Sequence, residues 1–358
     1  MRAKRGCVVR IAQVAPLYES VPPQLYGGTE RVVSYLTEEL VRQGHEVTLF
    51  ASGDSATAAE LVAVCPRSLR LDKGCVDQLA HHVLMLEQVR RRAADFDVIH
   101  FHIDYMHFPL SRRESLLQLT TLHGRLDLPD LAPLYDEFKD MPVVSISDAQ
   151  REPLPQALWL GTVYHGLPDL YCFNATPADY FAFIGRISPE KRVDRAIRIA
   201  RELGIPLRIA AKVDRVDREY FAKEIEPLID DKLIQYIGEI GENDKADFLC
   251  NARALLFPID WPEPFGLVMI EAMACGTPVI AYRRGSVPEV MEEGVSGFVV
   301  DDFPSALRAA EQVVSLDRQR CREAFERRFT AARMASDYAA LYRLLLEGDR
   351  RPRSSRAA

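Results

Sequence analysis

The feature that most constrains the fold of this chain is a regular alternation of short apolar runs, rich in β-branched residues, with longer amphipathic stretches. Such alternation predicts parallel sheets whose strands are joined by crossover helices. The expected strands of the first half are residues 8–14, 46–51, 97–102, 117–123, 142–147 and 161–166. Those of the second half are residues 180–185, 207–212, 234–238, 254–259, 278–282 and 296–300. We therefore expect an α/β fold with two doubly wound, Rossmann-like halves.

The length of the chain and one shift in composition predict two domains. At 358 residues the chain is more than twice the common domain size. The stretch GLPDLYCFNATPAD, residues 166–179, is rich in Pro, Asp and Asn and lacks periodicity, which is typical of a linker. We expect domains at residues 1–168 and 169–330. If they face one another, the carboxyl edges of both sheets meet at a cleft, where ligands of such folds bind.

Charge and cysteine content exclude several classes of protein. With 45 basic and 52 acidic residues the net charge is −7, which argues against a nucleic-acid-binding surface. Seven scattered cysteines without a CxxC pair indicate reduced packing residues and a cytoplasmic location. The opening could pass for a signal peptide, but Arg10 and Gln13 interrupt its apolar stretch and favour a strand. No apolar segment reaches the ~18–20 residues of a transmembrane helix, although peripheral membrane contact stays open.

Three places after predicted strands suit a phosphate group. Gly27 and Gly28 precede a helix amino end, where N–H groups and the helix dipole favour an anion, although these glycines could simply turn the chain. In GRISPEKRVDRAI, Arg186 and Lys191 fall at the start of a helix expected to begin near Pro189. Cations there oppose the dipole and need a compensating anion, unless they are solvated surface residues. The N–H groups of residues 265–268 form a third anion site.

Two glutamates lie in the stretch WPEPFGLVMIEAMACGTPVIA, residues 261–281. Glu263 precedes a short helix expected over residues 266–275, and Glu271 lies in its second turn, inside an apolar run. A buried carboxylate is costly unless it is paired or hydrogen-bonded. A glycosidase pair would need carboxyl groups ~5–9.5 Å apart, whereas eight residues of helix span about 12 Å. This spacing fits better with two carboxylates that accept hydrogen bonds from hydroxyl groups along an extended polar ligand.

Several other polar residues receive structural interpretations. Asp95 and Asp97 match a DxD metal motif, but they precede a strand at the edge opposite the predicted site, so we regard the match as incidental. His100 and His102 share one face of a strand without a third ligand at suggestive spacing, so no metal site is predicted. Asp148 is expected to cap a helix rather than to act in catalysis.

Taken in order, the glycine pair before a helix, GRISPEK, the E-x7-E pattern of Glu263 and Glu271, and ACGTPVIA resemble retaining nucleotide-sugar glycosyltransferases of family 4. The combination is specific, whereas each motif alone is not. The resemblance implies the GT-B fold, in which two Rossmann-like domains face a cleft and a last helix, here residues 331–348, crosses back to complete the amino-terminal domain. It also implies hexosyl transfer from a nucleotide sugar to a hydroxyl acceptor with retained anomeric configuration, without a metal or other cofactor.

The resemblance further implies which residues contact the donor. Glu271 would accept the ribose hydroxyls and Glu263 would hold the hexose. Arg186 and Lys191 would neutralise the diphosphate. The remaining implied donor contacts, to the hexose, the diphosphate and the base, are Gly27, Gly28, Glu239, Ile240, Phe265, Gly266 and Leu267.

The amino-terminal domain of this family binds the acceptor. The resemblance therefore places His123 beside the transferred sugar, and it makes His102, Asp104, Tyr105 and Arg125 acceptor candidates, with a structural role as the alternative. In the usual proposal for the family, the acceptor attacks the face from which the leaving group departs. A phosphate oxygen takes the proton of the acceptor, so no enzymic nucleophile is required, and cationic groups stabilise the departing diphosphate.

The identity of the ligands is less constrained than the reaction class. UDP-glucose is the first expectation for the donor and GDP-mannose the second, while the acceptor is a small molecule or a glycan. The alternatives are a nucleotide-sugar epimerase and a non-catalytic nucleotide-sugar-binding protein of the same fold, since fold does not fix function. The basic tail, residues 349–358, is interpreted as a disordered end rather than a polyanion-binding arm. Both a monomer and a homodimer fit the sequence.

Overall fold

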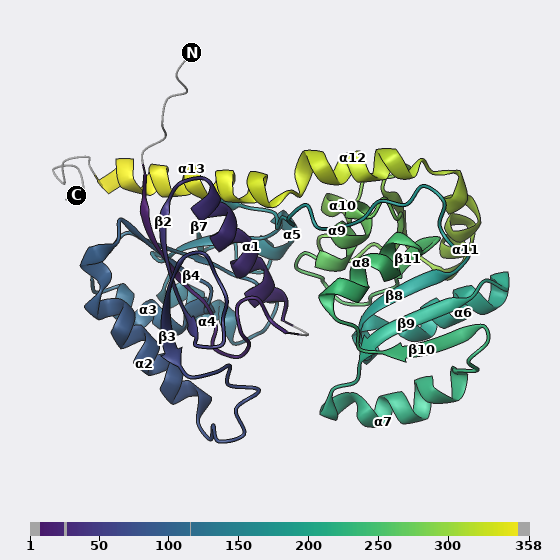
Figure 1. Ribbon diagram of the computed structural model, residues 1–358, viewed down its shortest axis with the longest axis horizontal. Helices are drawn as coiled ribbons and strands as arrows, with labels where there is room; N and C mark the ends of the chain where they lie inside the picture. The colour runs from purple at the N-terminus through teal and green to yellow at the C-terminus, as the bar shows by residue number, and fades with distance from the viewer. Residues whose placement is uncertain (1–7, 25–26, 115, 350–358) are drawn as a thin grey trace, which may run out of the picture. The chain divides into compact units, whose positions relative to one another are not determined.

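The computed structural model describes residues 8–24, 27–114 and 116–349, which form two compact units (Figure 1). The first unit contains residues up to 146, residues 151–166 and residues from 331 onward, and the second contains residues 147–150 and 167–330. The basic tail from residue 350 lies outside the described residues. Each unit is a parallel sheet flanked by helices, which confirms the expected fold class of two doubly wound, Rossmann-like domains.

The sheet of the first unit has the strand order β3-β2-β1-β4-β5-β6-β7, and its neighbouring strands are parallel. Its strands are β1 (Arg10–Val14), β2 (Glu46–Ser52), β3 (Glu60–Cys65), β4 (Val98–Phe101), β5 (Gln118–Thr121), β6 (Pro142–Ser145) and β7 (Leu158–Thr162). The helices that accompany it are α1 (Gly28–Arg42), α2 (Gln78–Arg91), α3 (Phe108–Ser111), α4 (Leu131–Glu137) and α13 (Ala331–Asp349). The short helix α5 (Asp148–Arg151) follows β6.

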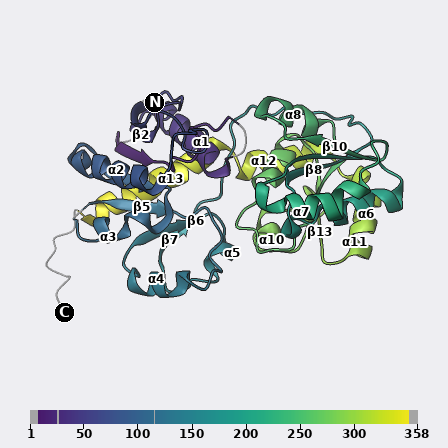
Figure 2. The same ribbon diagram turned by 90° about the horizontal axis from the view of Figure 1, so that it is seen from below.

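The last helix, α13, belongs to the first unit and packs beside α1 (Figure 2). Gln43, which ends α1, donates a hydrogen bond from Nε2 to the carbonyl oxygen of Ala332 (3.2 Å). Met334, Tyr338 and Tyr342 recur at helical spacing on α13 and are fully buried. The burial of this face attaches the end of the chain to the first sheet. Within the part of the chain that the structure describes, no helix combines the length and apolar character needed to cross a membrane.

The sheet of the second unit has the strand order β10-β9-β8-β11-β12-β13, again with parallel neighbours. Its strands are β8 (Phe181–Arg186), β9 (Leu207–Lys212), β10 (Ile234–Gly238), β11 (Ala254–Phe257), β12 (Val279–Tyr282) and β13 (Gly297–Val300). Its helices are α6 (Val193–Leu203), α7 (Arg218–Tyr220), α8 (Glu242–Cys250), α9 (Leu267–Ala274), α10 (Val287–Val290), α11 (Phe303–Gln312) and α12 (Arg318–Arg328).

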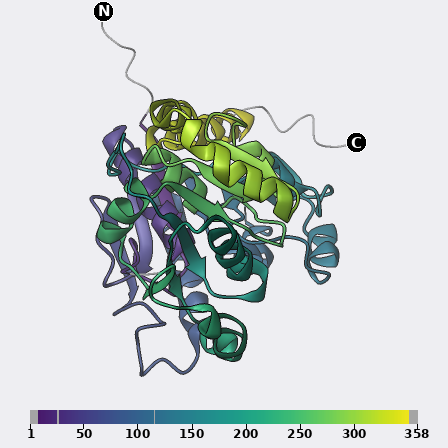
Figure 3. The same ribbon diagram turned by 90° about the vertical axis from the view of Figure 1, so that its right-hand side faces the viewer.

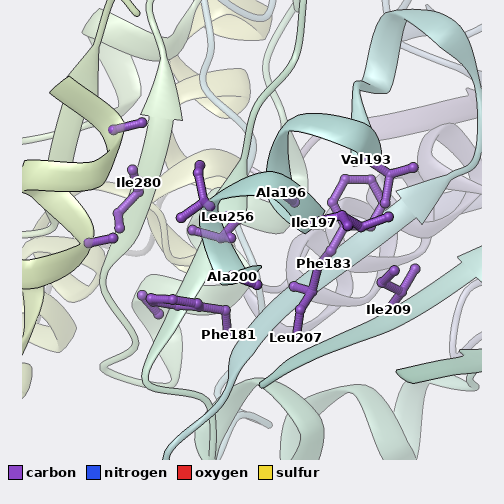
Figure 4. Close-up of a cluster of buried hydrophobic side chains, with 14 of the residues drawn as sticks. Phe181, Phe183, Val193, Ala196, Ile197, Ala200, Leu207, Ile209, Leu256 and Ile280 are labelled. Atoms are coloured by element: carbon purple, nitrogen blue, oxygen red, sulfur yellow. The ribbon is translucent and has the colours of Figure 1, made fainter. Parts of the chain in front are cut away.

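Helices cover both faces of this second sheet. On one face α6 and α11 enclose the apolar core shown in Figure 4. The residues of α6 in this core follow the i, i+3, i+4, i+7 spacing of an amphipathic helix and meet side chains of β8, β9, β11 and β12. The residues with this spacing are Val193, Ala196, Ile197 and Ala200, and Ile199 of the same helix also belongs to the core. On the other face α9 packs against β11 and β12 and is covered by α12. Helix α11, on the first face, also lies against the edge strand β13 (Figure 3).

The structure corrects four local expectations. Strand β3 was not expected, because its residues are mostly half-exposed at the sheet edge and give a weak apolar signal. Strand β7 begins at Leu158 rather than 161, since its pairing with β6 starts at that residue. Helix α6 begins at Val193, after a separate 3₁₀ turn at Pro189–Lys191 and a left-handed Arg192 (φ 52°). Ser147 rather than Asp148 caps α5, because its Oγ accepts a hydrogen bond from the N–H of Gln150 (3.0 Å).

Candidate functional site

Lys191 and Glu263 form an ion pair at the carboxyl end of the second sheet. Lys191 lies in the 3₁₀ turn after β8, and Glu263 lies in the loop after β11. The Nζ atom of Lys191 is 2.7 Å from Oε2 of Glu263, and the side chains are 19% and 11% exposed. The indole Nε1 of Trp261 donates to the same oxygen (2.9 Å), and the lysine ammonium lies 4.7 Å from the centre of the indole ring. One oxygen of the Glu263 carboxylate is therefore in contact with a cation and with a neutral hydrogen-bond donor.

Arg186, the last residue of β8, is surrounded by carboxylates. Its guanidinium group lies 2.5 Å from Glu190, 3.7 Å from Asp214 and 3.6 Å from Asp217. Burial acts to raise the pKa of Glu190, but hydrogen bonds from its own backbone, Ser188 and Arg186 hold the pKa below its usual value. Burial raises the pKa of Asp217, with Arg186 opposing this and the neighbouring carboxylates adding to it. The compensating anions expected for these cations are thus carboxylates when no ligand is bound.

Glu271 is paired with a lysine that sequence analysis missed. Glu271 lies in α9, and its side chain is 4% exposed. The Nζ atom of Lys245, in α8, lies 2.9 Å from Oε1 of Glu271. This pair explains how a carboxylate is tolerated within an apolar helix. The sequence indicates that Glu271 needs a partner, but several cations are available, and only the packing of α8 against α9 selects Lys245.

The amino end of α9 places backbone N–H groups near Glu263. Gly266 precedes the helix in a left-handed conformation (φ 81°), and no side chain caps this end among the described residues. The hydroxyl of Ser286 donates to the carbonyl oxygen of Phe265 (2.9 Å) and fixes the loop. A Cβ atom on Gly285 would lie 2.3 Å from the backbone oxygen of Glu263, so only glycine allows this close approach. The loop therefore presents Phe265, Gly266 and Leu267 in a defined conformation beside the carboxylate.

The remaining residues expected near the donor lie on two other loops. Glu239 is exposed and Ile240 half-buried directly after β10, where Gly238 turns the chain at φ 78°. In the first unit, Gly28 begins α1, and a Cβ atom on Gly27 would lie 2.7 Å from Pro23. The first turn of α1 also contains the buried Glu30, whose own carboxylate already interacts with this helix end.

The half-buried His123 belongs to a cluster whose other histidines are buried in the first unit. His123 follows β5, and its Nε2 atom lies 2.9 Å from Nδ1 of His102, which follows β4. The Nε2 atom of His102 lies 2.7 Å from Oε1 of Gln13 in β1. The ring of His165 stacks on that of His123 with centroids 5.4 Å apart and planes 18° apart. Burial is the main cause that lowers the pKa of all three histidines, to about 3 for His123.

The acceptor candidates differ in their surroundings. Both ring nitrogens of His102 have protein partners within the first unit. Asp104 has a positive φ of 51° and begins the 3₁₀ turn Asp104–His107, in which Tyr105 is 42% exposed. Arg125 lies within 2.6 Å of Asp127, and the guanidinium group holds the pKa of that carboxyl below its usual value.

The DxD pattern that we regarded as incidental has structural partners for both of its carboxylates. Asp97 accepts hydrogen bonds from the backbone N–H of Arg10 (2.9 Å) and from its guanidinium group (2.8 Å). Asp95 pairs with Arg92 at 3.1 Å. Both carboxylates of the DxD pattern thus form ion pairs within the first unit.

Comparisons with known proteins agree with this arrangement. Residues 174–328 match the family model described as Glycosyl transferases group 1, and residues 26–152 match the model described as Glycosyltransferase Family 4. The D-inositol 3-phosphate glycosyltransferase of Corynebacterium efficiens is 25% identical over 88% of this chain and 90% of its own length. Three other curated relatives align over only 45%, 28% and 31% of their own lengths, so the chain spans less than half of each.

Solved structures share the fold. A glycosyltransferase involved in avilamycin A biosynthesis superposes with a TM-score of 0.74 at 24% identity, covering 95% of this chain and 98% of its own. An Anabaena protein solved in complex with UDP and glucose superposes with a TM-score of 0.70 at 17% identity, covering 93% and 98%. These likenesses establish the GT-B fold. Together with the family models, they support a glycosyltransferase of the family 4 kind.

Proposed function

We propose that this chain, which carries the two domains of GT-B glycosyltransferases, transfers a hexosyl group from a nucleotide sugar to a hydroxyl acceptor with retained configuration. The observation that carries the proposal is the pair of cations at the end of β8, each held by carboxylates. Arg186 is surrounded by Glu190, Asp214 and Asp217, and Lys191 is paired with Glu263. A diphosphate is the ligand class that matches two adjacent cations of this kind.

The departing nucleoside diphosphate explains why cations are needed. Breaking the glycosidic bond leaves negative charge on the phosphate oxygens, and charges positioned in advance stabilise that state most. In our proposal Arg186 and Lys191 supply this stabilisation, so the reaction needs no metal ion. Glu263, released from Lys191 as phosphate binds, accepts hydrogen bonds from hydroxyl groups of the hexose, and the N–H groups at the start of α9 donate to oxygen atoms of the same sugar. Glu271 accepts the ribose hydroxyls while Lys245 keeps it ionised.

We also propose candidates for the donor and the acceptor. UDP-glucose is the first candidate, supported by the structural neighbour that was solved with UDP and glucose. GDP-mannose is the second, because Glu239 and Ile240, proposed to lie by the base, offer backbone groups that do not select one base. His123 of the first unit is proposed to lie beside the transferred sugar, and the proposed acceptor residues are His102, Asp104, Tyr105 and Arg125. A relative is named for D-inositol 3-phosphate, so phosphorylated polyols belong in the acceptor screen along with sugars and glycans.

Turnover with a labelled donor tests this proposal. Incubation with UDP-glucose or GDP-mannose and an acceptor panel is expected to give a product whose anomeric proton, by NMR, has the configuration of the donor. Glu263→Ala is expected to bind nucleoside diphosphate and to lose turnover. An epimerised free donor, or full turnover by Glu263→Ala, would contradict the proposal. Diphosphate binding without any transfer by the unaltered protein would favour the alternative of a binding protein.

A further inference from the structure

A continuous chain of hydrogen bonds runs through the first unit from α13 to the end of β5. Gln13 donates from Nε2 to the hydroxyl of Tyr342 (3.1 Å), and its Oε1 lies 2.7 Å from Nε2 of His102. The other nitrogen of His102, Nδ1, lies 2.9 Å from Nε2 of His123. The remaining nitrogen of His123, Nδ1, is buried and has no hydrogen-bond partner among the described residues. The chain therefore ends at one nitrogen of His123.

The direction of these hydrogen bonds follows from the chemistry of the amide. The Oε1 atom of Gln13 can only accept, so Nε2 of His102 carries a proton and donates it. A neutral imidazole has one N–H, so Nδ1 of His102 is an acceptor and Nε2 of His123 must donate to it. The same rule leaves Nδ1 of His123 without a proton. The unpartnered atom is thus a hydrogen-bond acceptor.

The surroundings keep these rings neutral. His102 is 2% exposed, and burial together with the neighbouring histidines lowers its pKa well below the usual value. The ring of His165, which follows β7, stacks on His123, and Arg333 of α13 adds a positive charge near His165. The titratable groups that interact with His123 from the surrounding elements are therefore three neutral histidines, His100, His102 and His165, and, behind His165, the cation Arg333. None of them carries a negative charge that would stabilise an imidazolium at His123.

We propose that Gln13 and His102 are positioning residues that fix His123 as its Nε2–H tautomer, so that Nδ1 accepts a hydrogen bond from a substrate hydroxyl. This inference rests on the proposed function, because the hydroxyl is that of the transferred sugar or of the acceptor. A buried acceptor nitrogen without a partner is uncommon in folded proteins and indicates a partner that arrives with the ligand. We call the hydrogen-bonded series from Gln13 through His102 to His123 the relay. Because the relay leaves an acceptor at Nδ1 of His123, a substrate hydroxyl group can donate to this position, whereas a carbonyl or phosphate oxygen cannot.

The tautomer can be measured without any assay of activity. Protein labelled with ¹⁵N-histidine gives long-range proton–nitrogen spectra in which protonated and unprotonated ring nitrogens differ in chemical shift. We expect Nε2–H for both His102 and His123 at pH 7.5. His107, buried elsewhere in this unit between Ser111 and Thr120, serves as an internal reference. A proton on Nδ1 of His123 in the unaltered protein overturns the proposal.

Two variants test the relay. In Gln13→Leu, Nε2 of His102 loses its acceptor, so the proton shifts to Nδ1 and His102 donates to His123. His123 then carries its proton on Nδ1 and offers a donor where the substrate needs an acceptor. We expect a reversed or mixed tautomer and a fall of about tenfold in kcat/KM, the cost of one hydrogen bond. Thr121→Val, which removes a hydroxyl bonded to His100 in the same core, is expected to leave the His123 tautomer and kcat/KM unchanged.

The outcomes separate this inference from the proposed function. Retention of the Nε2–H tautomer and of full kcat/KM by Gln13→Leu overturns the relay, whereas nucleoside diphosphate affinity is expected to be unchanged in that variant. An equal loss of activity in Thr121→Val would reduce the role of Gln13 to core packing and also overturns the relay. Failure of the unaltered protein to bind any nucleoside diphosphate contradicts the proposed function, while the tautomer measurement still decides the relay by itself. Should Gln13→Leu not fold, the spectrum of the unaltered protein decides.

Discussion

The polar centres of the two units are built from different chemistry. In the second unit, charged groups neutralise one another: Lys191 pairs with Glu263, and Lys245 pairs with Glu271. In the first unit, polar groups such as the buried His102 and the half-buried His123 are neutral and form directional hydrogen bonds. Ion pairs can exchange a carboxylate for a phosphate at little cost, whereas a neutral network holds one arrangement. The difference fits our proposal that the second unit binds a charged donor and that the first unit orients hydroxyl groups.

The largest expected difference between the two units is in their stability in mild acid. His107 and His123 have folded pKa values lowered to about 3, so below the usual pKa near 6.5 only the unfolded chain binds these protons. Stability is then lost as the pH falls, by about 2 kcal/mol for each histidine between pH 7 and 5. Hydrogen-exchange mass spectrometry should show this loss in peptides of the first unit. The second unit should be unchanged, because lowered carboxyl pKa values such as that of Glu190 make its losses begin only below about pH 4.5. Equal losses in both units would refute the contrast.

Removing the cation at the end of β8 should affect catalysis more than folding. Lys191→Met keeps much of the side-chain volume and removes the charge proposed to stabilise the departing diphosphate. We expect kcat to fall about 10²–10³-fold, as when a positioned transition-state donor is lost. Steady-state kinetics measures this, with Lys223→Met as a control, because Lys223 pairs with Glu219 on the surface of the same unit. A change of less than threefold in the Lys191 variant would contradict its role.

Breaking the ion pair between Lys245 of α8 and Glu271 of α9 should lower the stability of the second unit. Lys245→Met leaves the carboxylate of Glu271, 4% exposed, without its cation. We expect a loss of about 3 kcal/mol in the free energy of unfolding, measured by urea denaturation. The double variant Lys245→Met with Glu271→Leu should recover most of this loss, because it removes the unpaired charge. If the double variant is no more stable than the single one, the pair is not the reason for the loss.

The smallest effect is expected at the DxD pattern. Asp97→Asn keeps an oxygen that accepts from the N–H of Arg10 and removes a partly exposed charge whose ion pair with Arg10 lies at the surface. Neither turnover nor its dependence on added Mg²⁺ or Mn²⁺ should change. A metal-dependent loss of activity in this variant would show that the motif acts in the reaction.

The sequence predicted the fold well because its signal is periodic. Twelve expected strands correspond to strands of the two sheets, and only β3 was missed, since an edge strand with exposed residues lacks a continuous apolar run. The sequence also indicated that Glu271 requires a partner. It did not identify Lys245, because ion-pair partners depend on how helices pack. Trp261 and Glu190 stand two residues from Glu263 and four from Arg186, so local spacing could have found them.

The histidine network shows the limit of sequence analysis for a site. Gln13, His102, His123 and Tyr342 are separated by up to 329 residues and meet only because β1, β4, β5 and α13 converge. Neither the periodicity of the sequence nor a local motif indicates that residues so far apart in the chain are in contact. The resemblance to known glycosyltransferases pointed to His123, and the structure adds the residues that determine what its ring can do.

The central claim, that Arg186 and Lys191 form a diphosphate site, is tested most directly by isothermal titration calorimetry. The protein would be titrated with UDP, GDP and ADP, and the series repeated on Arg186→Gln and on Arg283→Gln, whose arginine pairs with Asp301 on the exposed surface of the same unit. We predict micromolar binding of one nucleotide that Arg186→Gln weakens at least tenfold and Arg283→Gln leaves unchanged. Absence of binding for all three nucleotides, or equal binding by both variants, would contradict the account.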